Sequence, residues 1–165
     1  MTPRPMHRQD RQLPQEEAWA LLTQGTYGGL SVVGDEGWPY AVPMHYTVMD
    51  GQIYLHCAKT GYKLDAIARD DRVCFTVTLR EELVQDHATS LYESVVVLGR
   101  AALVTDQATH QAALAHLVDA LGRVSPDLRD QYIARRGQNT AVLVIRPVHL
   151  TGKAKRDFRP IQQRM

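Results

Sequence analysis

Six segments of the chain are rich in β-branched and aromatic residues, and most of them alternate between apolar and polar positions. That alternation, with a period of two, is typical of strands with one buried face. The fifth segment is apolar on both faces at its centre, so we expect a central strand there. The predicted strands are Tyr27–Val33, Trp38–Met49, Gln52–Ala58, Arg72–Leu79, Tyr92–Thr105 and Thr140–Pro147.

The second predicted strand has an unusual pattern. Its even-numbered residues from Trp38 to Val48 form one apolar face, whereas Pro39 and Pro43 lie on the other side. Proline cannot donate to a strand ladder, so we expect an edge strand or an interrupted strand. Asp50-Gly51 follows directly and is a strong signal for a two-residue turn. The pattern therefore predicts that the third strand pairs back on the second.

Helical periodicity and capping residues predict four helices, which begin near residues 13, 63, 106 and 125 and end near 24, 69, 121 and 136. The third has a predicted buried stripe of Ala113, Leu114, Leu117, Val118 and Leu121. We expect Arg80–Ser90 to be a polar loop, and a basic tail, Thr151–Arg156, to follow the last strand. Short antiparallel connections favour a mainly β fold that closes into a barrel.

Length and composition limit the possible classes of protein. With 165 residues, the simplest organisation is one domain at 13–156, preceded by a mobile arm at 1–12 and followed by a tail at 157–165. A net charge of +1 gives no reason to expect a nucleic acid or a membrane as partner. Two cysteines without a CxxC motif indicate a reducing, cytoplasmic environment. Metal-ligand spacings such as HExxH and phosphate-loop motifs are absent, so we expect no metal site.

The stretch Ile53–Asp65 carries the most suggestive chemistry. His56 stands at the end of a predicted strand, and Lys59 and Lys63 follow near the start of a helix. A helix N-terminus with adjacent cations favours a phosphorylated ligand, and a histidine can handle a proton. The alternative is that His56 is a structural histidine at the barrel rim. Cys57 cannot pair with His56, because adjacent strand residues point to opposite faces, and it is expected to pack in the interior.

Five segments in order resemble a known family. His56–Asp65 resembles the His-x-Ala-x-x-Gly-x-Lys-Leu-Asp segment of the FMN-binding split barrels related to pyridoxamine-5′-phosphate oxidase, and is most similar to the nitroimidazole-resistance (Nim-type) branch. The other segments that agree with the family are Tyr27–Ser31 with Gly37–Tyr40, Val42–Tyr46, Tyr92–Ala101 and Thr151–Ala154.

The resemblance implies a six-stranded antiparallel Greek-key split barrel with peripheral helices, which forms a homodimer with FMN at the subunit interface. It implies that Lys63 pairs with the FMN phosphate and that the backbone of the flavin-edge strand reads the pyrimidine edge. Other residues would line the ring or complete the pocket, partly from the second subunit. The residues implied to bind the cofactor are Val42, Pro43, Met44, His45, His56, Cys57, Ala58, Lys63, Tyr92, Glu93, Ser94 and Lys153.

One difference from pyridoxamine oxidase itself bears on the substrate. Tyr62 precedes Lys63, and the Arg-Lys pair expected for additional phosphate contacts is missing. The leading hypothesis is therefore a nitroreductase-like, FMN-dependent oxidoreductase of small organic molecules, with His56 as the catalytic residue that donates a proton or stabilises negative charge. The alternatives are a flavin or haem binding module that acts as a redox carrier, and a small-ligand barrel without flavin.

Overall fold

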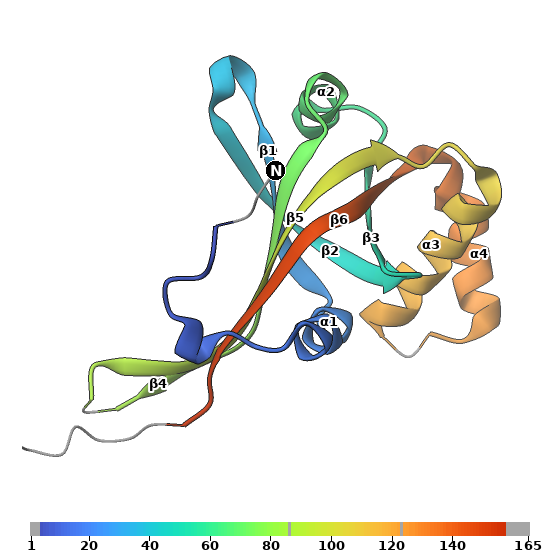
Figure 1. Cartoon of the computed structure of the whole chain (residues 1–165). Coiled ribbons are helices and arrows are strands. Elements are labelled where there is room, and N and C mark those ends of the chain that lie inside the picture. Colours follow the sequence, from blue (N-terminus) through green and yellow to red (C-terminus); the bar gives the residue numbers. More distant parts are fainter. Residues whose placement is uncertain (1–3, 86, 123, 158–165) are drawn as a thin grey trace, which may run out of the picture.

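Six antiparallel strands form a closed barrel in the computed structural model, which describes residues 4–85, 87–122 and 124–157. Residues 1–3 of the predicted arm and 158–165 of the predicted tail lie outside the described residues. The order around the barrel is β1-β2-β3-β6-β5-β4 (Figure 1). The strands are β1 (Tyr27–Val33), β2 (Pro39–Met49), β3 (Gln52–Ala58), β4 (Arg72–Val84), β5 (Thr89–Leu103) and β6 (Thr140–Lys155). The predicted mainly β, six-stranded fold is confirmed.

The order of the strands is that of a Greek key rather than of a simple meander. β3 lies beside β6 and β4 lies beside β1, although β3 and β4 are consecutive in the chain. The helix α2 (Tyr62–Arg69) connects them across one end of the barrel (Figure 1). β5 lies between β4 and β6, as its apolar centre predicted.

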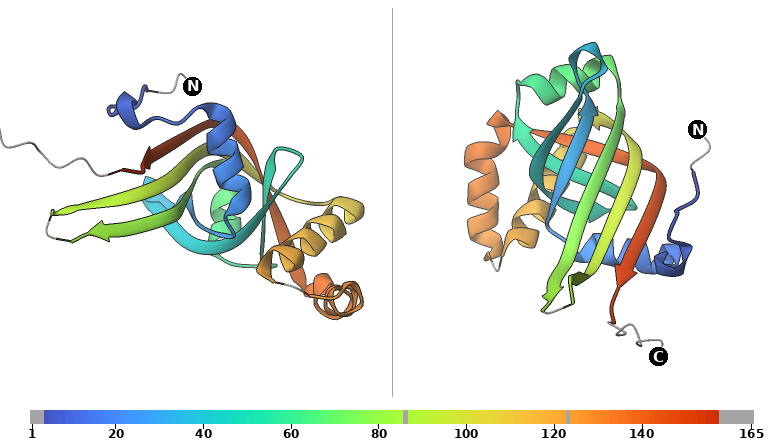
Figure 2. Two further views of the ribbon diagram at one scale, coloured as in Figure 1. Left: turned by 90° about the horizontal axis from the view of Figure 1, so that it is seen from below. Right: turned by 90° about the vertical axis from the view of Figure 1, so that its left-hand side faces the viewer.

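The predicted loop at Arg80–Ser90 is wrong. β4 continues to Val84 and β5 begins at Thr89, and the two strands remain paired as far as Val84↔Thr89. Figures 1 and 2 show this hairpin projecting beyond the barrel. Because both faces of the projecting ribbon meet solvent, Arg80, Glu81 and Glu82 are all exposed, and the sequence has no apolar alternation to reveal a strand.

The last strand is also longer than predicted, because β6 runs through the supposed basic tail to Lys155. Its register with β5 shifts at Leu98/Gly99, so that Val148 is an extra residue between Pro147 and His149. This bulge moves the side chains that face the barrel interior from odd positions such as Ile145 to even ones such as Leu150. The change of phase, together with a proline that cannot donate, made the strand seem to end at Pro147.

The four predicted helices are confirmed. α1 (Gln15–Gln24) packs against β6, and three short 3-10 turns are present at Gln9–Arg11, Asp35–Gly37 and Gly137–Asn139. α3 (Gln107–Leu121) and α4 (Pro126–Arg136) pack together beside β2 and β3, on one side of the barrel (Figure 2). Asp106 and Ser125 cap them by accepting hydrogen bonds from the amides of Thr109 and Leu128. Within the described ranges, no helix has the length and apolar character needed to span a membrane.

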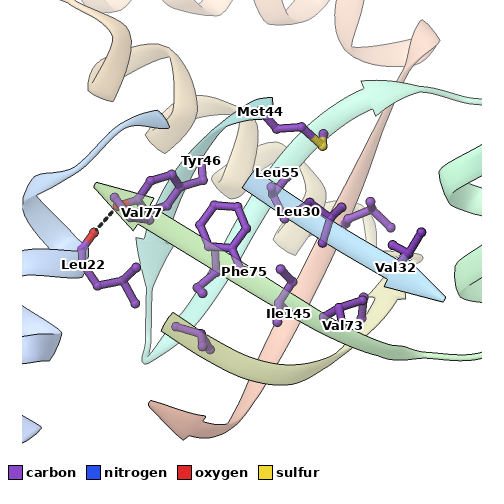
Figure 3. Close-up of a cluster of buried hydrophobic side chains, with 14 of the residues drawn as sticks. Leu22, Leu30, Val32, Met44, Tyr46, Leu55, Val73, Phe75, Val77 and Ile145 are labelled. Atoms are coloured by element: carbon purple, nitrogen blue, oxygen red, sulfur yellow. Dashed lines mark hydrogen bonds between the residues drawn. The ribbon is translucent and has the colours of Figure 1, made fainter. Parts of the chain in front are cut away.

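Two apolar clusters hold these layers together. The larger fills the barrel, where the rings of Tyr46 and Phe75 meet edge to face at 5.0 Å among aliphatic side chains such as Leu30 and Ile145 (Figure 3). The smaller lies between the outer face of the sheet and α3, and comprises Tyr54, Ala113, Leu114, Leu117, Val142 and Val144. The predicted stripe of α3 is correct at its start but wrong at Leu121, which is exposed.

Candidate functional site

The barrel is split between β2 and β3. Pro39–His45 of β2 pair only with β1, whereas Tyr46–Met49 pair with β3. In turn, His56–Ala58 of β3 pair only with β6. β2 and β3 therefore separate just past the Tyr46↔Leu55 pair, and the next two residues in register would be His45 and His56. Of the two predicted forms of this strand, an edge or an interrupted strand, the first is confirmed: β2 is continuous, and its part from Pro39 to His45 is an edge.

The split leaves backbone groups of β2 without a strand partner. The amide of Tyr46 donates to the carbonyl of Thr26 at 3.0 Å. The backbone N–H and C=O groups of the even-numbered residues of β2 therefore point toward β1. Because an antiparallel ladder alternates, the N–H and C=O groups of Ala41 and His45 and the C=O of Pro43 point toward the split instead. Proline is tolerated here because its missing N–H would have faced the gap.

A cavity of about 900 Å³ opens at this split, between the barrel and the α3–α4 pair. The barrel side is lined by Tyr27, Pro43, Met44, His45, His56, Cys57, Ala58 and Lys63. The fold brings seven of the predicted binding residues together in this cavity: Pro43, Met44, His45, His56, Cys57, Ala58 and Lys63. Val42 does not line the cavity but packs against the barrel core.

His56 faces the helical side of the sheet, like Tyr54, and is half-buried. Its Nδ1 atom is buried and has no hydrogen-bond partner among the described residues. Burial lowers the pKa of His56, and electrostatic repulsion from the neighbouring His45 ring lowers the pKa further. The imidazole is therefore neutral near pH 7. The ring of the neighbouring His45 packs on Tyr27 at 4.8 Å, and its Nδ1 lies 3.1 Å from the Thr26 carbonyl.

Cys57 contacts the barrel core, as expected from its alternation with His56. Burial raises the pKa of its thiol, although the positive charge of Lys63 opposes this rise. A protonated, partly buried thiol is a poor nucleophile, which agrees with the absence of a Cys–His pair.

Lys63 lies in the first turn of α2, where backbone amides lack helical partners, and it lines the cavity. Lys59 does not line it; that lysine borders a smaller cavity of about 300 Å³ beside His110. Of the two cations in the predicted phosphate site, the fold places only Lys63 at the split. No group of three His, Cys, Asp or Glu side chains that could hold a metal occurs in the described part of the chain.

The remaining predicted site residues form a separate cluster where β5 begins and β6 ends. Ser94 pairs with Lys153 and Glu93 with Ala154, while Arg156 forms an ion pair with Glu93. None of Tyr92, Glu93, Ser94 and Lys153 lines the cavity at the split. A single chain therefore contains two halves of the predicted site, which the fold does not bring together.

The Tyr92 hydroxyl is surrounded by positive charge. It accepts a hydrogen bond from Arg11 at 2.9 Å, and the Lys153 Nζ lies 5.6 Å from the ring centroid. Burial raises the pKa of Tyr92, but hydrogen bonds from Arg11 and Lys153 outweigh this effect, so the pKa lies below its usual value. Arg11 belongs to the predicted mobile arm, in which Gln12 also forms a bridge to Lys153.

Sequence reasoning missed the helical side of the cavity. Leu128, Tyr132 and Arg136 of α4 line it, together with Leu117 and Leu121 of α3. The serine cap and the apolar positions predicted these helices, but no local signal showed that their apolar surface faces a cavity. Leu121, which was predicted to be buried, is exposed and borders this cavity.

Comparison with known proteins places this arrangement in a family. The sequence model of the family described as pyridoxamine 5′-phosphate oxidase matches residues 14–154. The chain belongs to this family. A search of curated protein sequences gave no significant match.

Solved structures with the same fold include proteins described as flavin proteins. A candidate 5-nitroimidazole antibiotic resistance protein from Bacteroides thetaiotaomicron superposes with a TM-score of 0.70 at 22% identity, covering 87% of this chain and 86% of that one. The flavocytochrome Anf3 from Azotobacter vinelandii has a TM-score of 0.77 at 22% identity, covering 97% and 76%. An FAD-binding protein from Mesorhizobium loti has a TM-score of 0.65 at 23% identity, covering 88% and 97%.

Proposed function

We propose that this protein binds FMN at the split and acts as a nitroreductase-like oxidoreductase of small organic molecules. The observation that carries the proposal is the convergence, in one cavity, of free backbone groups on β2, the neutral His56 and the cation Lys63. A flavin supplies the electron chemistry, and the protein supplies binding, orientation and control of protons. The flavin-binding members of the fold support this proposal.

The residues present at the split fit a flavin. The outward-facing backbone groups of Pro43 and His45 match the alternating donors and acceptors of a pyrimidine edge. Met44 and Ala58 offer apolar contact to a planar ring, and Lys63 offers a charge for the phosphate. The buried Nδ1 of His56 has no partner in the described chain, which is the kind of unsatisfied group that a bound polar ligand would explain.

His56 is the proposed catalytic residue. Because the imidazole is neutral near pH 7, its one ring N–H can donate a hydrogen bond to an oxygen that gains negative charge. Transfer of a proton to the substrate instead requires the imidazolium, which the lowered pKa of His56 makes less populated at that pH. Apolar side chains line much of the cavity, and a less polar surrounding strengthens such an interaction.

The second half of the proposed site comes from a second copy of the chain. Tyr92, Ser94 and Lys153 are too far along the barrel to line the cavity of their own chain. A homodimer that places this cationic cluster against the split of the partner would complete the FMN site. Both cysteines are free thiols, which supports the proposal that the protein works in the reducing cytoplasm.

The visible spectrum and an anaerobic assay test the proposed function. Freshly purified protein should show a flavin spectrum, and chromatography of the released cofactor should give FMN rather than FAD. The reduced protein should be oxidised by nitroaromatic compounds faster than free FMN is.

Two variants test the roles of the residues at the split. His56→Ala should retain the flavin and lose turnover, whereas Lys63→Gln should bind FMN more weakly. A colourless protein that does not bind added FMN would contradict the proposal, and a flavin spectrum without turnover would indicate a redox carrier.

A further inference from the structure

The cavity at the split has two chemically different walls. The barrel wall contributes every group used by the proposed function, including His56 and Lys63. The opposite wall, formed by α3, α4 and the turn that follows, is mainly apolar and has no role in that function. We call this second surface the helical wall; its side chains used below are Leu117, Leu121, Leu128, Tyr132 and Arg136.

The helical wall leaves large apolar side chains uncovered. Leu121, Leu128 and Tyr132 are 50%, 56% and 52% exposed, although each borders the cavity. Leu117, one turn before Leu121, is buried and anchors α3 to the sheet. The wall is thus a firmly attached surface whose outer part stays about half exposed in the described chain, which favours contact with an apolar ligand.

The charges around the cavity all have one sign. Arg136 and Lys63 line it, and none of its described lining residues carries a carboxylate. The Arg136 guanidinium lies 5.5 Å from the centroid of the Tyr132 ring. Among the residues that the structure describes, no carboxylate forms an ion pair with Arg136. The helical wall therefore combines apolar surface with a guanidinium that has no anionic partner there.

We propose that the helical wall is the substrate subsite and that it selects a planar apolar molecule with an anionic group, such as an aromatic carboxylate. The ring packs between the wall and the proposed flavin, and the carboxylate binds the Arg136 fork, which suits planar bidentate anions. This inference rests on the proposed function, since it assigns substrate binding to the wall that faces the proposed flavin. Lys63 serves the cofactor phosphate, and Arg136 serves the substrate.

Binding of matched aromatic probes tests this division of roles. Naphthoate and naphthamide share the same ring system and differ in charge, and each can be titrated into the FMN-loaded protein by calorimetry. Naphthoate should bind more tightly, by about tenfold or more, because a hydrogen bond to a charged group is worth more than one to a neutral group. Arg136→Gln should remove this preference and leave the affinity for FMN unchanged. The matched control, Arg135→Gln, removes a neighbouring exposed arginine that does not line the cavity.

A second variant tests the apolar part of the wall. Leu128→Asn should weaken naphthoate and naphthamide by the same factor, roughly threefold to tenfold, because it removes apolar contact without changing charge. Leu103→Asn, at a similarly exposed leucine outside the cavity, should leave both affinities unchanged.

Three results would overturn the inference. The first is equal affinity for naphthoate and naphthamide. The second is an equal effect of Arg135→Gln and Arg136→Gln on the preference for naphthoate. The third is that Arg136→Gln loses affinity for FMN and keeps its affinity for naphthoate. The last would place Arg136 at the cofactor phosphate. If the protein bound no FMN, the proposed function would fail on its own, and the same titrations of the flavin-free protein would still decide whether the helical wall selects aromatic anions.

Discussion

At the scale of single residues, the positions that matter are those whose polar atoms are buried. His56 combines a half-buried ring with an unpartnered Nδ1, and Tyr46 places its hydroxyl in the barrel interior. The two differ because Tyr46 has a protein partner: its hydroxyl donates to the Leu22 carbonyl at 2.6 Å. Tyr46 is therefore expected to serve stability, whereas the unsatisfied His56 is available for function.

The lowered pKa of His56 predicts how stability depends on pH. The unfolded imidazole titrates near its usual 6.5, whereas the folded one titrates below that value because of burial. The unfolded state therefore binds more protons just below pH 6.5, so stability is fully present above this pH and is lost as the pH falls toward the folded pKa. Urea unfolding between pH 5 and pH 7.5 should show this loss for the wild type and a smaller one for His56→Gln. Exposed His116→Gln is the control, and an unchanged slope in His56→Gln would disprove the assignment.

Tyr46→Phe should destabilise the fold without affecting ligand binding. The substitution leaves the Leu22 carbonyl, in the last turn of α1, buried without its donor, at a cost of about 1–3 kcal/mol. Chemical denaturation should measure this decrease in the free energy of unfolding. Tyr40→Phe, at a more exposed ring, should change it little; equal effects would mean that the buried hydrogen bond contributes nothing.

At the scale of elements, close approach between α1 and β6 depends on Gly152. A Cβ at this position would lie 2.6 Å from the Cβ of Ala18, and the amide of Leu13 donates to the Gly152 carbonyl at 3.0 Å. The Thr151-Gly152-Lys153 stretch is thus part of a packed strand that fixes the start of α1, rather than a solvated tail. The strand pattern alone did not reveal this, because the bulge at Val148 reverses the alternation.

Gly152→Ala should separate α1 from the barrel. Because both neighbouring elements are well packed, we expect a loss of about 1–3 kcal/mol in the free energy of unfolding. Gly122→Ala, where a Cβ would meet nothing within 4 Å, is the matched control. Thermal and urea unfolding of both variants would test the prediction, and equal stability of the two would show that the contact with Ala18 relaxes without cost.

At the scale of the whole molecule, the main feature is that the two halves of the predicted site lie apart in one chain. Lys63 lines the cavity at the split, and Lys153 belongs to the cluster around Tyr92. A two-fold dimer can unite them, because each subunit then contributes one half to each of two equivalent sites. To unite both halves within one chain, Lys63 would have to leave α2 or Lys153 would have to leave β6.

Mixed dimers of two inactive variants distinguish these arrangements. Lys63→Gln and Lys153→Gln should each bind FMN weakly when alone. If the site is shared, unfolding and refolding the two together should restore tight binding to about a quarter of the sites, since half of the dimers are mixed and each has one intact site. Fluorescence titration of FMN would measure this fraction. If mixing restored no tight site, Lys63 and Lys153 would not act across the interface.

The sequence by itself determined the six strands, the four helices, the Asp50-Gly51 turn and most of the barrel side of the cavity. These features depend on local properties: alternation, capping, and backbone angles such as the positive φ of Asp50 and Gly51. Only the tertiary structure showed that β2 and β3 separate after Tyr46, that Tyr92 and Lys153 lie away from the split, and that Leu128 and Arg136 face it. These facts depend on which elements meet in space, and a chain with one apolar face per element does not specify locally which partner will cover that face.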